Sequence, residues 1–285
     1  MFNEKPFTTW EDAVIWLRNQ PDKRQLVLDA FYDDPLIDAA ERYFAGAEWK
    51  AVSKLLQHRT GKALDVGAGR GIASYALARS GFTVTALEPD PSAVVGTAAI
   101  RGLAAEARLP IEVVEEFSEH LPFAEGTFDV VFARAVLHHM RDLDSACREV
   151  FRVLRPGGIL IAAREHVISK EADLREFLDQ HPLHHLYGGE RAFLLDQYVG
   201  ALRTAGFATI EVLAPLKSPI NLFPYTIETL RAAVVERLTD KIPIKPVWGA
   251  ALASTSIFAS LLSMAERFDH RPGRLYSFVC HKGPA

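Results

Sequence analysis

The spacing of apolar residues in the first sixty positions is helical. Behind Thr9, a potential helix cap, apolar side chains recur on one side of a helix at Trp10, Val14, Ile15 and Leu17. Two more helices are predicted, one over Pro35–Phe44 and one that starts at Ala47 and ends at Gly61. Residues 1–60 are therefore predicted to form an N-terminal helical segment.

From residue 63 the pattern changes to short apolar runs that alternate with helical stretches. The runs predict strands at Ala63–Val66, Thr83–Leu87, Ile111–Val114, Phe128–Phe132 and Ile159–Ala163. Helices are predicted after Gly71, over Ser92–Ala107 and over Leu143–Leu154. Strands that alternate with helices indicate βαβ units with right-handed crossovers, and hence a doubly wound α/β domain with a parallel sheet.

The regular alternation ends after residue 163. Residues 170–191 are polar and rich in histidine, and a helix at Leu195–Thr204 and a strand at Thr209–Leu213 follow. Two helices, Thr226–Leu238 and Ala250–Phe268, precede a last strand at Leu275–Cys280. We expect a seven-stranded, mostly parallel sheet with helices on both faces, built from residues 61–216 and 274–285. Residues 217–273 are predicted to be a helical insertion, either a lid over an acceptor pocket or an oligomer interface.

Within that insertion, Pro246 to Ala265 carries no charge and approaches the length of a membrane span. Its five serine and threonine residues favour a packed helix in a soluble domain, with contact to a membrane surface as the alternative. The N-terminus has no apolar core of a signal peptide, and Cys147 and Cys280 form no CxxC pair. A cytoplasmic protein is the expectation. The net charge of −4 and the lack of a basic block disfavour nucleic acid as a partner.

A glycine-rich segment, "ALDVGAGRGIASYALA", joins the first predicted strand to a helix. Gly67 and Gly69 begin a G-x-G-x-x-G pattern, but the third glycine, Gly71, comes one residue early. Asp65 precedes the first glycine by two residues. Glu88 closes the next strand, where a carboxylate reaches the hydroxyl groups of a ribose that carries no phosphate.

Four segments in this order resemble class I S-adenosylmethionine-dependent methyltransferases, of the type 11, ubiquinone-biosynthesis-like group of small-molecule enzymes. They read "LDVGAGRG", "ALEPD", "LPFAEGTFDVVFARAVLHHM" and "REVFRVLRPGGILIAARE". The resemblance covers about a hundred residues, Ala63 to Ala163. It implies a Rossmann-like fold, the cofactor S-adenosyl-L-methionine and an enzyme that transfers a methyl group, and it does not identify the acceptor.

The resemblance also implies which residues bind the cofactor. These are Asp65, Gly67, Ala68, Gly69, Gly71, Glu88, Pro89, Phe117, Ser118, Ala133 and Arg134. Small residues let the methionyl part approach the loop, Asp65 offsets the charge of its amine, and Glu88 holds the ribose. The family often has Asp where this chain has Phe117. Glu116, Glu119 or the backbone around Phe117 and Ser118 are the alternatives for the adenine contact.

Histidines dominate the predicted acceptor side. His138 follows the fourth strand and is the candidate catalytic base, since a neutral imidazole accepts a proton near neutral pH. The predicted substrate contacts are His166, His184, His185 and Tyr187. The plainer interpretation of the histidine-rich segment is a solvated surface loop. No HExxH or similar spacing is present, so no metal site is predicted.

The leading hypothesis is an enzyme that methylates an oxygen, nitrogen or carbon atom of a small molecule, which the apolar insertion would allow to be apolar. The alternatives are a cofactor-binding protein without catalysis and a nicotinamide-dependent oxidoreductase; the early third glycine counts against the latter. A homodimer is the expected assembly if the insertion is an interface. An amino-methylating enzyme of DNA is disfavoured, because Ala133–Val136 replaces the motif that such enzymes carry.

Overall fold

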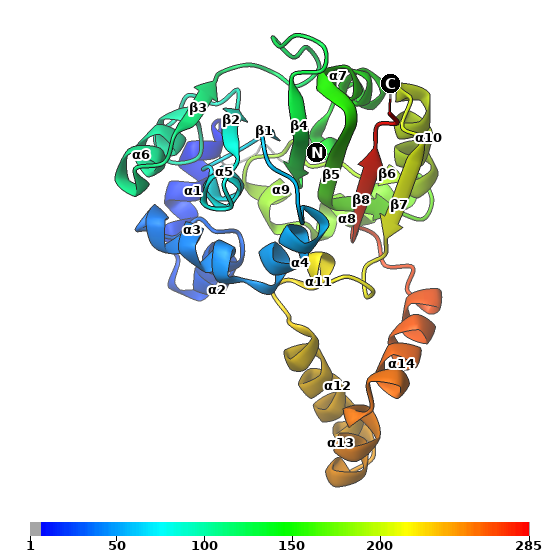
Figure 1. Ribbon diagram of the computed structural model, residues 1–285. Coiled ribbons are helices and arrows are strands. Elements are labelled where there is room, and N and C mark those ends of the chain that lie inside the picture. Colours follow the sequence, from blue (N-terminus) through cyan, green and yellow to red (C-terminus); the bar gives the residue numbers. More distant parts are fainter. Residues whose placement is uncertain (1–6, 285) are drawn as a thin grey trace.

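A twisted sheet forms the centre of the molecule (Figure 1). The computed structural model describes residues 7–284. The strand order is β3-β2-β1-β4-β5-β8-β7, and the two-residue β6 pairs with β5 outside this path. The strands are β1 Lys62–Val66, β2 Thr83–Leu87, β3 Ile111–Val114, β4 Phe128–Arg134, β5 Leu154–Ile168, β6 Phe193–Leu194, β7 Thr209–Leu213 and β8 Arg274–His281. Among the strands of residues 7–284, only β8 runs antiparallel to its neighbours. The prediction of a doubly wound, mostly parallel α/β sheet is confirmed.

The central strands are buried because helices cover both faces of the sheet. Strand β4 has six consecutive buried residues, and in register Ala63 pairs with Val130 and Asp65 with Phe132. Strands covered on both sides consist of continuous apolar runs, which is the pattern that the sequence shows. The covering helices are α5 Ile72–Arg79, α6 Thr97–Ala107, α7 Leu143–Val153 and α10 Leu195–Ala205.

The N-terminal helical segment packs against this body. Its elements are α1 Trp10–Arg18, η1 Pro21–Lys23, α2 Arg24–Asp29, α3 Leu36–Ala45 and α4 Ala47–Leu55. Thr9 caps α1 as predicted, because its side chain accepts the N–H of Asp12 at 3.1 Å. The expectation that Ile15 belongs to the buried side of α1 is wrong. Ile15 is 43% exposed, because the buried side is formed by Ala13, Val14 and Leu17.

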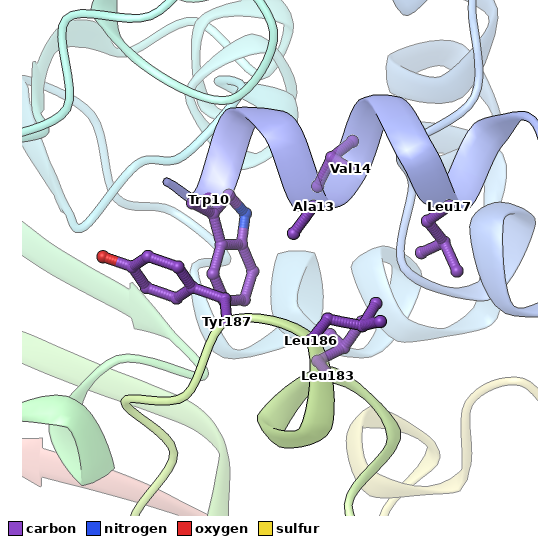
Figure 2. Close-up of a pocket in the computed structure, with 7 residues that line it drawn as sticks. All are labelled: Trp10, Ala13, Val14, Leu17, Leu183, Leu186 and Tyr187. Carbon is purple, nitrogen blue, oxygen red and sulfur yellow. The ribbon is translucent and has the colours of Figure 1, made fainter. Parts of the chain in front are cut away.

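The histidine-rich segment contains two helices, α8 Asp173–Gln180 and α9 Pro182–Leu186. Figure 2 shows that α1 lies across α9, with Trp10 and Leu17 facing Leu186 and Tyr187 around a small apolar hollow. The rings of Trp10 and Tyr187 meet edge to face at 5.3 Å. The N-terminal segment therefore holds the histidine-rich segment against the body.

The helices between β7 and β8 differ from all the others in their placement. The short α11, Pro219–Leu222, packs on α4, β5 and β8, so the body extends beyond residue 217, where the insertion was predicted to start. Helices α12 Ile227–Lys241, α13 Lys245–Ala253 and α14 Thr255–Phe268 project from the body (Figure 1). We call these three helices the arm. They surround an apolar cluster of their own, with Leu252, Phe258 and Leu262 at its centre.

The single helix expected at Ala250–Phe268 is in fact two. The chain bends by 97° between α13 and α14, where Ser254 caps the second helix by accepting the N–H of Ile257. Among residues 7–284, no single helix is long and apolar enough to cross a membrane. The bent pair α13–α14 meets the length and composition criteria only when both helices are taken together.

Candidate functional site

The glycine-rich loop after β1 leaves open space in front of its backbone. Gly67 and Gly69 adopt left-handed conformations, with φ of 61° and 54°. A Cβ atom on Gly69 would have no atom within 4 Å, whereas one on Gly67 would collide with Val136 at 2.7 Å. The backbone at Gly69 can therefore be approached closely by a ligand, and Gly67 is required for packing against the turn after β4.

Glu88 connects this loop to the end of β2. Its carboxylate accepts the N–H of Gly69 at 2.8 Å with Oε2 and the N–H of Asp90 at 3.0 Å with Oε1. Burial raises the pKa of Glu88, and these two N–H groups oppose the rise. The predicted ribose-binding carboxylate therefore lies next to the open face of the glycine loop, at the carboxyl end of its strand.

Asp65 occupies a different environment from the one expected of an amine contact. Its side chain is buried and accepts a hydrogen bond from Ser74 of α5 at 2.6 Å. Burial raises the pKa of Asp65 to about 7, against the effect of the Ser74 hydrogen bond. Asp65 thus ties β1 to α5 beneath the loop, and its contact with the amine stays a prediction.

The loop that follows β3 supplies an exposed aromatic ring. Phe117 is 63% exposed, while its neighbour Ser118 is buried and donates a hydrogen bond to Met140 Sδ at 2.9 Å. An exposed ring offers an apolar face to a flat heterocycle. Together with the open backbone at Gly69 and the carboxylate of Glu88, this set fits a nucleoside-containing cofactor.

The remaining residues assigned to the cofactor lie behind this surface. Ala133 is fully buried in β4, and Ala68 and Gly71 shape the backbone of the loop, where the N–H of Gly71 donates to the carbonyl of Ala68 at 2.8 Å. Pro89 is half-buried after β2. The side chains of Ala133 and Ala68 are buried, so only their backbone is available to a ligand, and the assignment of these residues to the cofactor stays a prediction.

Arg134, at the end of β4, is engaged by the N-terminal helices. Its guanidinium forms two hydrogen bonds with Glu48 of α4, at 2.6 and 3.0 Å, and lies over the rings of Phe31 and Tyr43. Burial lowers the pKa of Arg134, but the carboxylate of Glu48 outweighs it and raises the pKa above the usual value. The sequence did not identify Glu48, although an acidic residue on the buried side of a helix is a signal for a paired charge.

His138 lies at the centre of a buried group of ionisable side chains. Its Nδ1 is 2.7 Å from Glu165 Oε2, and its Nε2 is 3.6 Å from Glu190 Oε2. Burial lowers the pKa of His138, but the carboxylates of Glu165 and Glu190 outweigh it and raise the pKa to about 9. Both ring nitrogens of His138 face carboxylates, which hold a proton on the ring and do not favour a role as a base. The role of His138 as the catalytic base stays a prediction.

Glu165 was not assigned a role from the sequence. It lies in β5 with no exposed surface and accepts the backbone N–H groups of Val136, Leu137 and His138 at 3.0–3.1 Å. This carboxylate holds the turn after β4 in place. The signal for it is an acidic residue among the apolar residues of a strand.

Of the predicted substrate contacts, His166 lies directly against His138. Their ring centroids are 4.7 Å apart, and His166 Nδ1 lies 3.0 Å from the carbonyl of Gly273. His185 is exposed and bonds the carbonyl of Asp179, and Tyr187 packs on Trp10. His184 lies on α9 and is half-buried. The predicted roles of these residues in substrate binding are not tested by this geometry.

Comparison with known proteins agrees with the geometry of the cofactor region. Residues 64–162 match a family described as "Methyltransferase domain". A ubiquinone biosynthesis O-methyltransferase of Methylobacterium nodulans is 30% identical over 162 residues, which cover 55% of this chain and 64% of that protein. The match spans less than two thirds of the length of this enzyme and of other curated relatives.

Solved structures share the fold. The [4+2]-cyclase SpnF is 25% identical, with a TM-score of 0.51 over 82% of this chain and 80% of that one. Phosphoethanolamine N-methyltransferase 2 of Haemonchus contortus, in complex with S-adenosyl-L-methionine, is 19% identical, with a TM-score of 0.53 over 92% of this chain and 60% of that one. Residues 64–162 thus match the methyltransferase domain family, and the chain shares the fold of a methyltransferase solved with S-adenosyl-L-methionine.

Proposed function

We propose that the protein transfers a methyl group from S-adenosylmethionine to a small-molecule acceptor. The observation that carries this proposal is the contact between Glu88 and the N–H of Gly69, at 2.8 Å. It places a carboxylate suited to a ribose beside an open stretch of backbone suited to the methionyl part. Once bound, the cofactor supplies a methyl group on a sulfonium, which needs alignment with the acceptor more than further activation.

The chain's own residues divide the work between two regions. Glu88 and the backbone of Gly67–Gly69 would hold the cofactor, with Phe117 beside the adenine. The acceptor would lie beyond the ends of β4 and β5, at the turn that Glu165 holds through three N–H groups. The N-terminal helices, tied to Arg134 by Glu48, would exclude water from this edge.

We further propose a cytoplasmic location and a self-associating arm. The two cysteines, Cys147 and Cys280, are buried free thiols, a state that suits a reducing compartment. The arm exposes apolar side chains at Val247, Ile257 and Phe268 and projects away from the sheet, which favours the interface over the lid. Sedimentation over a range of concentrations tests the homodimer.

The cofactor assignment is tested by a Glu88→Ala substitution. Loss of the ribose contact should weaken binding of S-adenosylhomocysteine, measured by calorimetry, by about 1–3 kcal/mol. Glu112→Ala, an exposed acidic residue on the neighbouring β3, is the matched control and should bind as the unmodified protein does. Equal affinity in both variants would remove Glu88 from the cofactor site.

Turnover is tested separately, by mass spectrometry of a metabolite extract incubated with the protein and methyl-labelled cofactor. We expect label in a small molecule and an equal amount of S-adenosylhomocysteine. Normal cofactor binding with no labelled product in cofactor-replete extracts would favour the alternative of a binding protein without methyl transfer. The named activity of the similar cyclase makes this control necessary.

A further inference from the structure

Four imidazole rings and one carboxylate meet at the edge of the sheet where β4 and β5 end. We call them the histidine cluster: His138 and His139 of η2 (Leu137–His139), His166 of β5, His181 before α9, and Glu190. The ring centroid of His138 lies 4.2 Å from that of His139 and 4.7 Å from that of His166. The ring centroids of His166 and His181 are 5.3 Å apart. The chain brings these residues together from positions as far apart as 138 and 190, so their meeting is a property of the fold.

Glu190 is the common partner of these rings. The residue is only 5% exposed, and its Oε2 lies 3.6 Å from His138 Nε2 and 3.9 Å from His139 Nε2. Its other oxygen, Oε1, lies 3.9 Å from His181 Nδ1. Each distance exceeds the range of about 2.7–3.2 Å for a hydrogen bond that involves nitrogen and oxygen. These distances are too long for hydrogen bonds and close to the separation of two ligand atoms bound to one metal ion.

The far side of two of these rings is held by the protein. His138 Nδ1 lies 2.7 Å from the carboxylate of Glu165, and His139 Nδ1 lies 3.1 Å from the carbonyl of Gly189. With the proton on each Nδ1, the lone pair of each Nε2 points toward Glu190. Metal-binding histidines are oriented in this way, by a carboxylate or a carbonyl on the nitrogen that does not bind the metal.

We propose that His138 Nε2, His139 Nε2 and Glu190 Oε2 bind one divalent transition-metal ion, with zinc as the ion of matching chemistry. Bonds of about 2.0–2.1 Å in tetrahedral geometry separate ligand atoms by about 3.4 Å. The spacings of 3.6 and 3.9 Å need only a small contraction to reach that value. Two imidazoles and a carboxylate leave a fourth position open, as catalytic zinc sites do.

Charge supports the same assignment. Glu165 has no exposed surface and Glu190 is nearly buried, so two carboxylates share one low-dielectric region. Binding of a dication would displace the proton from His138 Nε2 into solvent, and the ion would then balance both carboxylates and remove most of the cost of burying them. His139, whose side chain is 39% exposed, gives the ion a route from solvent.

A second group, His166, His181 and Glu190, also has ligand atoms within 4.8 Å of one another. Both groups contain Glu190, so a single ion would bind to one group or to the other. His181 Nδ1 already accepts the N–H of His184 at 3.3 Å, as the cap of α9. The proposal therefore assigns the ion to His138 and His139.

If the proposed function holds, the ion has a use there. It would lie at the acceptor edge, where its open position could bind an acceptor oxygen and lower the pKa of that hydroxyl group. The acceptor would then release its proton to solvent, without a histidine base. This role rests on the proposed methyl transfer, whereas metal binding itself does not.

The test measures metal binding by the untagged, full-length protein after removal of metals with a chelator, with no cofactor present. Calorimetry with zinc chloride should give about one ion per chain, and cobalt(II) should give the visible absorption of a tetrahedral site. Glu190→Gln, which preserves size, and His139→Ala, at a partly exposed position, should each weaken zinc binding at least about tenfold. His120→Ala, an exposed histidine outside the cluster, should leave it unchanged.

Zinc affinity that is the same in the unmodified protein, Glu190→Gln and His139→Ala would overturn the proposal, as would no binding at all. Loss of binding in His181→Ala with normal binding in His139→Ala would overturn the choice of ligands. Circular dichroism of each variant confirms that it is folded. Because no cofactor is used, failure of this test leaves the cofactor assignment of Glu88 standing, and failure of the Glu88 test leaves the metal site standing.

Discussion

The two sets of helices added to this sheet, α1–α4 and the arm, relate to the site in opposite ways. The N-terminal helices bury Leu17, Tyr43 and Trp49 against the body, and Glu48 is 1% exposed where it binds Arg134. In the arm, α12 has no buried residue, and the ion pair between Lys245 and Glu236 leaves both side chains 59% exposed. Sequence length and helicity are similar in the two sets, so burial against the sheet edge decides which of them shapes the site.

The largest effect is expected from Glu48→Ala. The substitution leaves the guanidinium of Arg134 buried without its carboxylate, which costs about 3–5 kcal/mol in the free energy of unfolding. Urea denaturation measures this loss. Glu236→Ala, which breaks the exposed ion pair of the arm, is the matched control and should change stability by about 0–1 kcal/mol.

Equal effects of the two substitutions would contradict the comparison between the buried and exposed segments. A small effect of Glu48→Ala alone would show that Arg134 finds another partner, and Asp65, whose pKa Arg134 lowers, is the charged candidate. Measuring cofactor affinity in the same variant separates loss of folding from loss of the site.

A smaller, pH-dependent effect is expected at Asp65 in the body. Its pKa is raised to about 7 in the folded protein, mainly by burial and further by Glu88, while Ser74 and Arg134 oppose the rise. The folded state therefore holds a proton that the unfolded chain releases near pH 4. The stability that Asp65 contributes is present below that pH and is lost as pH rises through about 7.

The expected loss between pH 4 and pH 8 is on the order of 2–4 kcal/mol. Asp65→Asn keeps an oxygen for Ser74 but does not titrate, so the stability difference between this variant and the unmodified protein should shift in the variant's favour as pH rises. Denaturation at pH 5 and pH 8 measures it. Glu236→Gln in the arm should show no such shift, and a constant difference for Asp65→Asn would mean that Asp65 ionises normally in the folded protein.

The sheet and the cofactor loop were accessible from the sequence because local rules dictate them. Alternating apolar runs predicted where most of the strands lie along the chain, and the glycines at 67 and 69 are required by their positive φ angles. Glu88 follows from its place at a strand end. These features depend on residues that are close together in the chain.

The histidine cluster and the arm were less accessible because they depend on distant pairings. Glu190 lies beside His138 through tertiary packing, in which the segment around α9 contacts α1. No fixed spacing between Glu190 and His138 in the sequence indicates this contact. The break between α13 and α14 lies at Ser254, which caps α14. Apolar residues continue at helical spacing on both sides of Ser254, so the pattern alone predicts one continuous helix. Whether an apolar helix covers the body or projects from it depends on tertiary contacts that the pattern does not contain.

The smallest effect on the site is expected from Phe258→Ala in the arm. The ring of Phe258 is 2% exposed at the centre of the arm's own apolar cluster, under the guanidinium of Arg231 at 5.0 Å. Its removal should cost the arm about 3–5 kcal/mol of local stability. Faster amide hydrogen exchange in residues 227–268 would report that loss.

Because the arm packs mainly on itself and projects from the body, this loss should not reach the cofactor region. Affinity for S-adenosylhomocysteine should stay within a factor of about two, which corresponds to roughly 0.4 kcal/mol. Trp49→Ala is the counterpart in α4, where the ring is also 2% exposed but contacts Phe132 of β4. That variant should weaken both global stability and the site. A Phe258→Ala protein with cofactor affinity reduced more than fivefold would instead make the arm a lid, since only a segment that contacts the bound state can transmit its own unfolding to the cofactor.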